Sequence, residues 1–243
     1  MNVKLTLFDS YENALCNITA LLDSGKKVFV VAINAEKLYR ASVDSEILNV
    51  LNQAELYICD GVGAKLATFI LHGRWTPRIT GVKLFPELIK SAEKSQKSVF
   101  LLGGSPEVNQ STALKLKSDY PLLRLAGRMD GYFDESSDAV EAINNSEAQL
   151  VFVALGSPKQ ELWITENRGK LNADFCMGVG GSFDVVCGTV KRAPIFFRKT
   201  GTEWLHRLLA QPTRWRRQLA LPKFVLLLLK VKLRALRSDS PNG

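Results

Sequence analysis

Short apolar runs recur along the chain and predict buried strands. Residues 28–34, 99–106 and 151–158 each begin with Val-Phe and continue as an apolar run that ends in Gly, Ser or Asn. Runs of this kind are typical of parallel strands that are covered on both faces. Two shorter runs, at 56–59 and 174–177, predict two further strands.

Helical patterns separate these runs. Apolar residues recur at helical spacing over residues 35–54, 82–95 and 106–116. Strands that alternate with helices predict an α/β fold with a mostly parallel sheet. Ligands of such sheets bind beyond the carboxyl ends of the strands, so the residues that follow each strand are the candidates for chemistry.

Small and polar residues follow two of the predicted strands, at 103–107 (GGSPE) and 156–161 (GSPKQE). Ser followed by Pro indicates a helix start, and Ser157 with Gln160 has the spacing of a capping box. Free amide groups at a helix start also favour a phosphate group. The sequence leaves open whether these segments only cap helices or also bind phosphate.

Three other polar residues stand where a ligand would bind. Asp60 directly follows the run at 56–59, where it can act as a general base, cap the next helix or hold a ribose hydroxyl. Asn34 ends the run at 28–34, and Arg78 is a candidate anion anchor. The segment 178–184 (GVGGSFD) is rich in glycine but lacks the spacing of a dinucleotide fingerprint.

Composition excludes several classes of protein. With 46% hydrophobic and 23% charged residues, the chain can bury a core and is not disordered. The four cysteines are scattered, which argues against disulfides or structural zinc and favours a reducing cytoplasm. The two histidines suit no hydrolase triad, and no Asp-x-Asp indicates a clamped divalent metal. We therefore expect no metal and no cofactor.

Charge is distributed unevenly. Residues 191–237 contain thirteen Lys or Arg and one acid, Glu203, a net charge of +12, so the rest of the chain carries −4 of the total +8. This segment interleaves Trp204, Trp215 and leucines with arginines, as interfacial membrane helices do. A helical hairpin docked on the body is the alternative. The apolar run 224–229 is too short to span a bilayer, and no signal peptide is evident.

Nine motifs together resemble the WecG/TagA/CpsF family of bacterial glycosyltransferases, in the family's order. They are 31–37 (VAINAEK), 60–61 (DG), 78–82 (RITGV), 100–107 (FLLGGSPE), 130–133 (DGYF), 156–161 (GSPKQE), 177–184 (MGVGGSFD), 191–194 (KRAP) and 203–212 (EWLHRLLAQP). The first and seventh are most similar to the branch of the family that builds enterobacterial common antigen. That branch implies transfer of N-acetyl-D-mannosaminuronic acid from its UDP donor to undecaprenyl-diphosphate-linked GlcNAc.

The resemblance also implies a mechanism and a layout. It implies an inverting, metal-independent single displacement on a Rossmann-like domain, residues 1–195, with a membrane-associating helical appendage, residues 196–243. By the resemblance, Asp60 is the base and Asn34 an active-site amide. The residues implied or expected to bind substrate are Arg78, Gly81, Gly103, Gly104, Gly156, Lys159, Gln160, Glu161, Gly180, Asp184, Lys191, Arg207, Arg214 and Arg217.

One departure from the family pattern concerns the donor sugar. Teichoic-acid members carry Thr two residues before the Asn, where this chain has Ala32. This puts an N-acetylmannosamine donor in doubt without establishing the uronate. The protein is expected in the cytoplasm, peripheral on the inner face of the cytoplasmic membrane, where docking of the appendage would complete the site.

Three alternatives remain. A member of the same family could transfer another UDP-sugar, such as N-acetylmannosamine or glucose, in teichoic acid, capsule or exopolysaccharide assembly. A nucleic-acid-binding protein would use the basic tail, but no recognition motif supports it, and no nucleic-acid partner is expected. A dinucleotide-dependent enzyme is disfavoured by the missing fingerprint.

Overall fold

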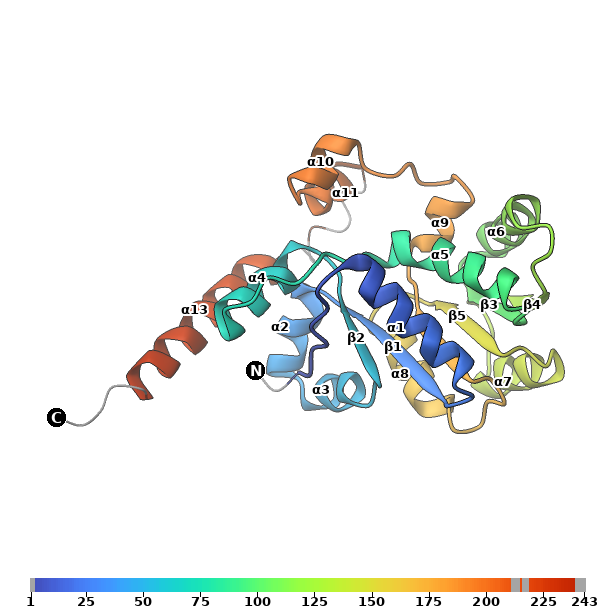
Figure 1. Ribbon diagram of the computed structural model, residues 1–243, viewed down its shortest axis with the longest axis horizontal. Helices are drawn as coiled ribbons and strands as arrows, with labels where there is room; N and C mark the ends of the chain where they lie inside the picture. The colour runs from blue at the N-terminus through green and yellow to red at the C-terminus, as the bar shows by residue number, and fades with distance from the viewer. Residues whose placement is uncertain (1–2, 211–214, 216–218, 239–243) are drawn as a thin grey trace.

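A six-stranded parallel sheet forms the centre of the computed structural model, which describes residues 3–210, 215 and 219–238. The strand order is β2-β1-β6-β5-β3-β4 (Figure 1). The strands are β1 (Val28–Ile33), β2 (Leu56–Cys59), β3 (Val99–Gly103), β4 (Leu125–Met129), β5 (Leu150–Ala154) and β6 (Phe175–Gly178). All pairs are parallel, so the six carboxyl ends lie along one edge.

Helices cover both faces of the sheet, which confirms the predicted α/β fold. Successive side chains of a strand point to opposite faces, so Phe29 and Val31 enter one core while Val28 and Val30 enter the other. The second core is covered by α1 (Tyr11–Asp23), α5 (Gly81–Lys94), α6 (Pro106–Asp119) and α9 (Ser182–Val186). The first is covered by α2 (Ala35–Val43), α3 (Ser45–Asn52), α4 (Val62–His72), α7 (Ser136–Asn145), α8 (Lys159–Asn167) and α13 (Ala220–Ser238).

Two predicted elements differ from the observed ones. The helix predicted over 35–54 is two helices, because Asp44 ends α2 and its Oδ1 accepts hydrogen bonds from the first amides of α3. The edge strand β4 was not predicted from the pattern. Its residues alternate between half-buried and exposed, so it has no continuous apolar run.

The two predicted helix starts also differ in outcome. Ser105 caps α6 as predicted, since its Oγ accepts a hydrogen bond from Val108 N at 3.3 Å. The predicted capping box of Ser157 and Gln160 is wrong. Helix α8 begins at Lys159 with no side-chain cap, and the side chain of Gln160 turns into the interior.

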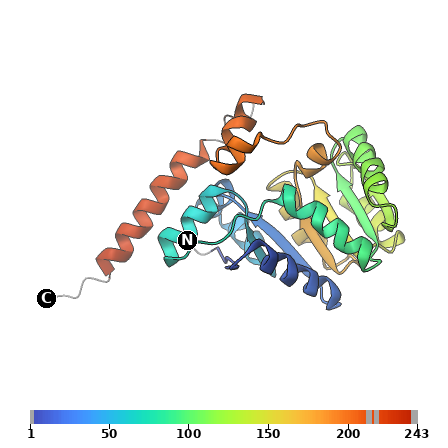
Figure 2. The ribbon, with the colours of Figure 1, turned by 45° about the horizontal axis from the view of Figure 1, so that its top comes forward.

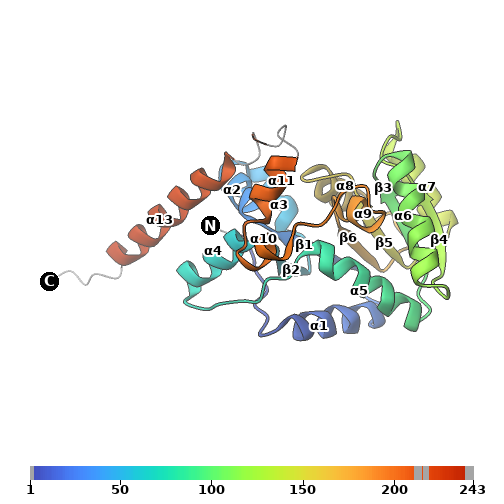
Figure 3. The ribbon, with the colours of Figure 1, turned by 90° about the horizontal axis from the view of Figure 1, so that it is seen from above.

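The C-terminal segment contributes to the core of the body. Phe224 and Leu228 of α13 are each 1% exposed and belong to the same apolar cluster as Leu38 of α2. Helices α10 (Ile195–Lys199) and α11 (Glu203–Ala210) lie at the same end of the molecule as α4 and α13 (Figures 2 and 3). No helix in the described part of the chain is both long and apolar enough to span a bilayer.

Candidate active site

The carboxyl edge of the sheet gathers most of the residues that the sequence predicted for the site. Asn34 follows β1, Asp60 follows β2, and Gly103 ends β3. Gly156 follows β5 and Gly180 follows β6. Since the strands are parallel, these positions meet at one edge although they are far apart in the sequence.

Asn34 and Asp60 are held next to each other by the sheet. The amide N of Asp60 donates to the carbonyl O of Ile33 at 2.7 Å, one residue before Asn34. Asn34 is the N-cap of α2, and its Oδ1 accepts a hydrogen bond from Lys37 N at 2.9 Å. This cap uses the carbonyl oxygen of the side chain, so the cap does not occupy the hydrogen-bond donors of Nδ2.

Three loops converge around the carboxylate of Asp60. A Cβ placed on Gly81, the first residue of α5, would lie 4.0 Å from Asp60 Oδ2 and 3.9 Å from Ser182 Oγ. Ser182 begins α9 and donates through Oγ to Val179 O at 2.8 Å. The absence of a side chain at Gly81 therefore leaves space between the carboxylate and the loop that follows β6.

Cys59, directly before Asp60, is not suited to be a nucleophile. Burial, and next the negative charge of Asp60, raise the pKa of the Cys59 thiol to about 11, while a hydrogen bond with Thr76 opposes the shift. The thiol therefore stays protonated near neutral pH. The carboxyl group of Asp60, by contrast, belongs to a partly exposed residue.

A buried polar network lies directly behind the edge. Lys37 Nζ is 2.8 Å from Glu161 Oε1 and donates to Ala32 O at 2.6 Å. Gln160 Nε2 donates to Glu161 Oε1 at 2.8 Å, and Gln160 Oε1 accepts from Gly180 N at 3.1 Å. The network thus connects the end of β1, the first turn of α8 and the loop after β6.

Gln160 and Glu161 are placed differently from exposed ligand-binding residues. Their side chains are almost fully buried, at 3% and 2% exposed. Glu161 Oε2 is buried with no hydrogen-bond partner among the described residues, and any side chain at Gly178 would collide with Gln160. Their contacts support a positioning role, in which they fix the glycine-rich loop 178–181 against the sheet. Substrate contact by either residue stays a prediction.

The glycines after β3 bring two strands close together. Gly103 has φ +104°, and a Cβ there would lie 2.6 Å from the backbone of Ala154 in β5. Gly104 N then donates to Ala154 O at 3.0 Å. Glu107 follows in the first turn of α6, where a hydrogen bond with Ser105 lowers the pKa of its carboxyl. This exposed negative charge opposes a phosphate at the start of α6.

The remaining predicted residues of the body lie around this edge. Lys159 is exposed, with Nζ 5.9 Å from the ring centre of Phe133. Gly156 has φ +75° and faces open space. Asp184 lies on α9 close to Gly181, and Lys191 is exposed after that helix. The structure therefore keeps Lys159 exposed at the start of α8 and Lys191 exposed in the segment after α9.

Arg78 joins the edge to the C-terminal segment. Arg78 Nη2 is 2.7 Å from Glu203 Oε2 at the start of α11, and both side chains are largely buried. The neighbouring Ile79 N donates to Cys59 O at 2.9 Å, which fixes Arg78 close to the end of β2. Glu203, the single acid of the basic segment, was not predicted as a site residue, and its isolation among cations was the signal available in the sequence.

The structure describes only part of the three predicted tail arginines. The backbone of Arg207 belongs to α11, while its side chain lies outside what the structure describes. Arg214 and Arg217 lie outside the described residues altogether. Substrate binding by these three arginines stays a prediction.

Two further features concern binding sites elsewhere. Within the described part of the chain, no cluster of three or more His, Cys, Asp or Glu side chains could hold a metal ion. A shallow groove of about 460 Å³ lies between α7 and α8, and none of the predicted site residues lines it. The carboxyl edge remains the candidate site.

The fold and the edge define an α/β protein with an aspartate, an amide and glycine-rich loops at the strand ends. Residues 1–238 match the family model described as "Glycosyl transferase WecG/TagA/CpsF family". The chain therefore belongs to this family and is a glycosyltransferase, as the resemblance implied.

Two relatives have established names. An N-acetylglucosaminyldiphosphoundecaprenol N-acetyl-beta-D-mannosaminyltransferase of Bacillus spizizenii (strain ATCC 23059 / NRRL B-14472 / W23) is 38% identical over 212 residues, covering 87% of this chain and 82% of the relative. A protein of the same name from Bacillus subtilis (strain 168) is 34% identical over 222 residues, covering 88% and 87%. Neither name mentions a uronate, so the uronic acid donor stays a prediction.

Proposed function

We propose that the protein transfers an N-acetylmannosamine-type sugar from UDP to undecaprenyl-diphosphate-linked GlcNAc. The observation that carries the proposal is the convergence of Asn34, Asp60, Gly81 and Ser182 at the carboxyl edge. Acceptor and sugar type come from the printed names of the two relatives. A UDP donor is what the family resemblance implies.

Asp60 is the proposed general base. It accepts the proton of an acceptor hydroxyl while that oxygen attacks the anomeric carbon. The bond from this carbon to the UDP oxygen breaks, and UDP leaves with the electron pair, so the anomeric configuration inverts. A positioned base contributes on the order of 10² to 10⁴ in rate. Asn34 Nδ2 is the proposed donor that orients the sugar.

The charges at the edge bear on the choice of donor. A uronate carboxylate requires a cation, yet Lys37 is ion-paired with Glu161 and Arg78 with Glu203. This pairing favours the neutral N-acetylmannosamine donor over N-acetylmannosaminuronic acid, for which Lys159 and Lys191 are the exposed cations among the predicted site residues whose side chains the structure describes. The uronate, and with it the enterobacterial common antigen pathway, is the second candidate.

The test supplies the full-length protein with a prenyl-diphosphate-GlcNAc analogue and, in separate reactions, each of the two UDP-sugars or UDP-glucose. The mass of the product distinguishes the neutral sugar from the uronate. Asp60→Asn serves as the matched control, because it removes the base and preserves the shape of the side chain. Absence of transfer from both donors, with glucose transferred instead, would refute the proposed substrate class.

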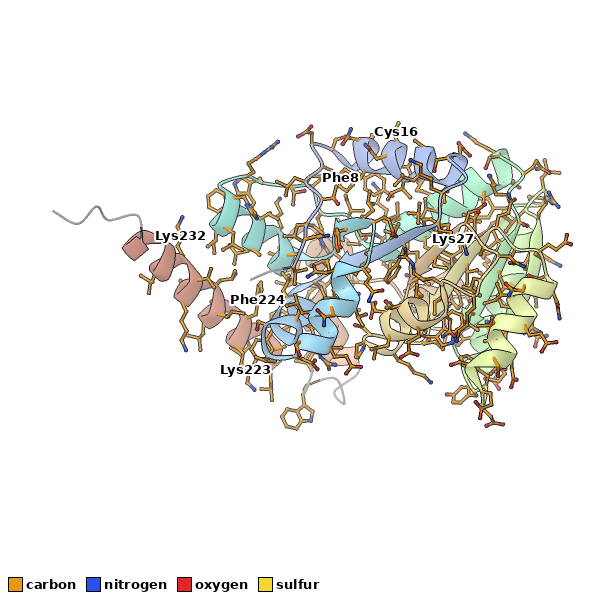
Figure 4. The ribbon with its side chains drawn as sticks, turned by 90° about the horizontal axis from the view of Figure 1, so that it is seen from below. Phe8, Cys16, Lys27, Lys223, Phe224 and Lys232 are labelled. Carbon is orange, nitrogen blue, oxygen red and sulfur yellow. The ribbon has the colours of Figure 1, made fainter. Side chains whose placement is uncertain are left out.

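Helix α13 supports peripheral attachment to the cytoplasmic face of a membrane. Opposite its buried residues it exposes an apolar stripe, Val225, Leu226, Leu229 and Leu233. Lys223, Lys230 and Lys232 are exposed on the same helix, and Figure 4 labels Lys223 and Lys232 on it. An apolar stripe together with cations suits the interface of an anionic bilayer, where the lipid-linked acceptor resides.

We propose that the catalytic part, residues 1–195, and the appendage, residues 196–243, differ in function, although they share one apolar core. Since Phe224 and Leu228 fill the core of the body, deleting the appendage also removes part of that core. Point substitutions in the exposed stripe of α13 therefore test membrane attachment more cleanly than a truncation does.

A further inference from the structure

Exposed aromatic side chains also occur outside the appendage, on the catalytic part. Phe69 of α4 is 41% exposed, and Trp75, shortly after α4, is 59% exposed. Their rings stack with centroids 4.3 Å apart and an interplanar angle of 11°. Lys65 Nζ lies 5.1 Å from the centre of the Trp75 ring. The three side chains form one outward-facing group, the α4 aromatic pair with its lysine.

This group lies at the end of the molecule that carries the appendage. Helix α4 packs against α13, and Figures 1 and 3 show both with α10 and α11 at the same end. Most of the other large apolar side chains that are exposed in the described part also belong to these helices. The opposite end, with α6 and α7, exposes few.

We infer that the α4 aromatic pair is a second membrane contact, made by the catalytic part itself, and that its occupant is the interface of an anionic bilayer. The inference rests on the proposed function. Tryptophan and phenylalanine bury an apolar ring at the headgroup level of a bilayer, and a neighbouring lysine adds attraction to anionic lipid. The exposed Asp9 is nearby but is ion-paired with Arg74 at 3.2 Å.

Charge favours a bilayer over a second copy of the chain. Lys65 stands on this surface, and Lys223, Lys230 and Lys232 stand on the adjacent α13. A two-fold interface would bring these like charges together, whereas anionic lipid neutralises them.

The segment after Trp75 links this contact to the candidate active site. Thr76 Oγ1 donates to Phe8 O at 3.3 Å, and Ile79 N donates to Cys59 O at 2.9 Å, next to Asp60. A lipid contact at Trp75 therefore fixes how the carboxyl edge faces the membrane. It is expected to matter for a membrane-embedded acceptor and not for a short, water-soluble one.

Fluorescence quenching by brominated lipid tests the contact directly. In the full chain with Trp204→Phe and Trp215→Phe, the tryptophans are Trp75 and Trp163, and Trp163 is buried at 4% exposed. Vesicles of brominated phosphatidylglycerol are expected to quench the emission of Trp75. Equal emission with brominated and unbrominated vesicles, while the protein sediments with both, would overturn the inference.

A matched pair of variants tests its contribution. Phe69→Ser with Trp75→Ser is expected to weaken binding to phosphatidylglycerol vesicles about tenfold, because two rings leave the interface. Leu114→Ser with Leu122→Ser, at exposed positions on the other end, is the control and is expected to bind as wild type. Unchanged vesicle binding by the first variant would contradict the inference. So would shielding of Trp75 from solvent that increases with protein concentration in the absence of lipid, because it would indicate a second copy of the chain on this surface.

The outcome is separable from that of the proposed function. Transfer to a water-soluble acceptor analogue is expected to be the same in the aromatic variant and in wild type, while transfer to a long-chain acceptor in vesicles falls. If no donor is transferred at all, the proposed function fails, and the quenching result still decides whether Trp75 enters the bilayer.

Discussion

Replacing Lys37 with Met removes the cation that faces Glu161 in the interior. Lys37 is 5% and Glu161 2% exposed, and Glu161 Oε2 already has no hydrogen-bond partner among the described residues. After the substitution, the buried carboxylate keeps the hydrogen bond from Gln160 Nε2 as its one polar contact within the described part of the chain. Removal of one partner of a buried ion pair costs about 3–5 kcal/mol, a large fraction of the roughly 5–15 kcal/mol that stabilises a typical domain.

A double-mutant cycle separates this charge effect from lost packing. Lys37→Met combined with Glu161→Gln removes both charges, so we expect the double variant to be more stable than Lys37→Met alone, with a coupling of about 2 kcal/mol. Lys115→Met is the matched control, since it breaks an exposed ion pair with Asp119 and should cost below about 0.5 kcal/mol.

The assay is equilibrium unfolding in urea, followed by circular dichroism. If Lys37→Met lost no more than the Lys115→Met control, or if the two substitutions added without coupling, the argument that this ion pair is a buried support of the site would be refuted. A loss of stability in both single variants that the double variant reverses would support it.

Four further outcomes are expected. Asp60→Asn should lower turnover by about 10² or more with little change in melting temperature, because it removes a base at a partly exposed position; wild-type turnover would exclude Asp60 as the base. Glu203→Gln should lower stability by about 1 kcal/mol and slow transfer to the lipid-linked acceptor, because it releases α11 from Arg78; unchanged kinetics would show that this ion pair is dispensable. Gly103→Ala should cost more than about 2 kcal/mol in urea unfolding, since φ is +104° and the Cβ meets the β5 backbone at 2.6 Å; a smaller loss would mean that the strands readily separate. Burial raises the pKa of Cys59 to about 11, so the protonated thiol stabilises the fold fully below pH 9, and this stabilisation is lost as the pH rises through 11. Relative to a Cys59→Ala variant, wild type should lose up to about 2 kcal/mol of unfolding free energy between pH 9 and pH 11. Parallel curves of unfolding free energy against pH for the two proteins would argue against this effect.

The sequence by itself determined the sheet and the place of its chemistry. Parallel strands covered on both faces must be continuously apolar, so β1, β2, β3, β5 and β6 could be located from the pattern alone. Once the strands were located, Asn34 and Asp60 had to meet at the carboxyl edge. The strand β4 was missed because its residues alternate between half-buried and exposed and therefore show no apolar run, whereas β2, at the other edge of the sheet, is fully buried.

Only the tertiary structure decided which partners the buried polar groups take. The local pattern shows which positions are apolar, but it carries no information on contacts between distant segments. The spacing of Ser157 and Gln160 predicted a cap, whereas Gln160 hydrogen-bonds Gly180 across the edge. Nothing near Lys37 in sequence indicates Glu161, and nothing near Arg78 indicates Glu203.

The C-terminal segment shows the same division. Its charge and its tryptophans predicted a membrane-facing helix, because composition alone reports a basic amphipathic stretch. The sequence could not distinguish its two apolar faces: Phe224 and Leu228 fill the core beside α2, while Val225 and Leu229 stay exposed. Which apolar face is buried depends on the neighbouring helices, and these are brought into place only by the fold.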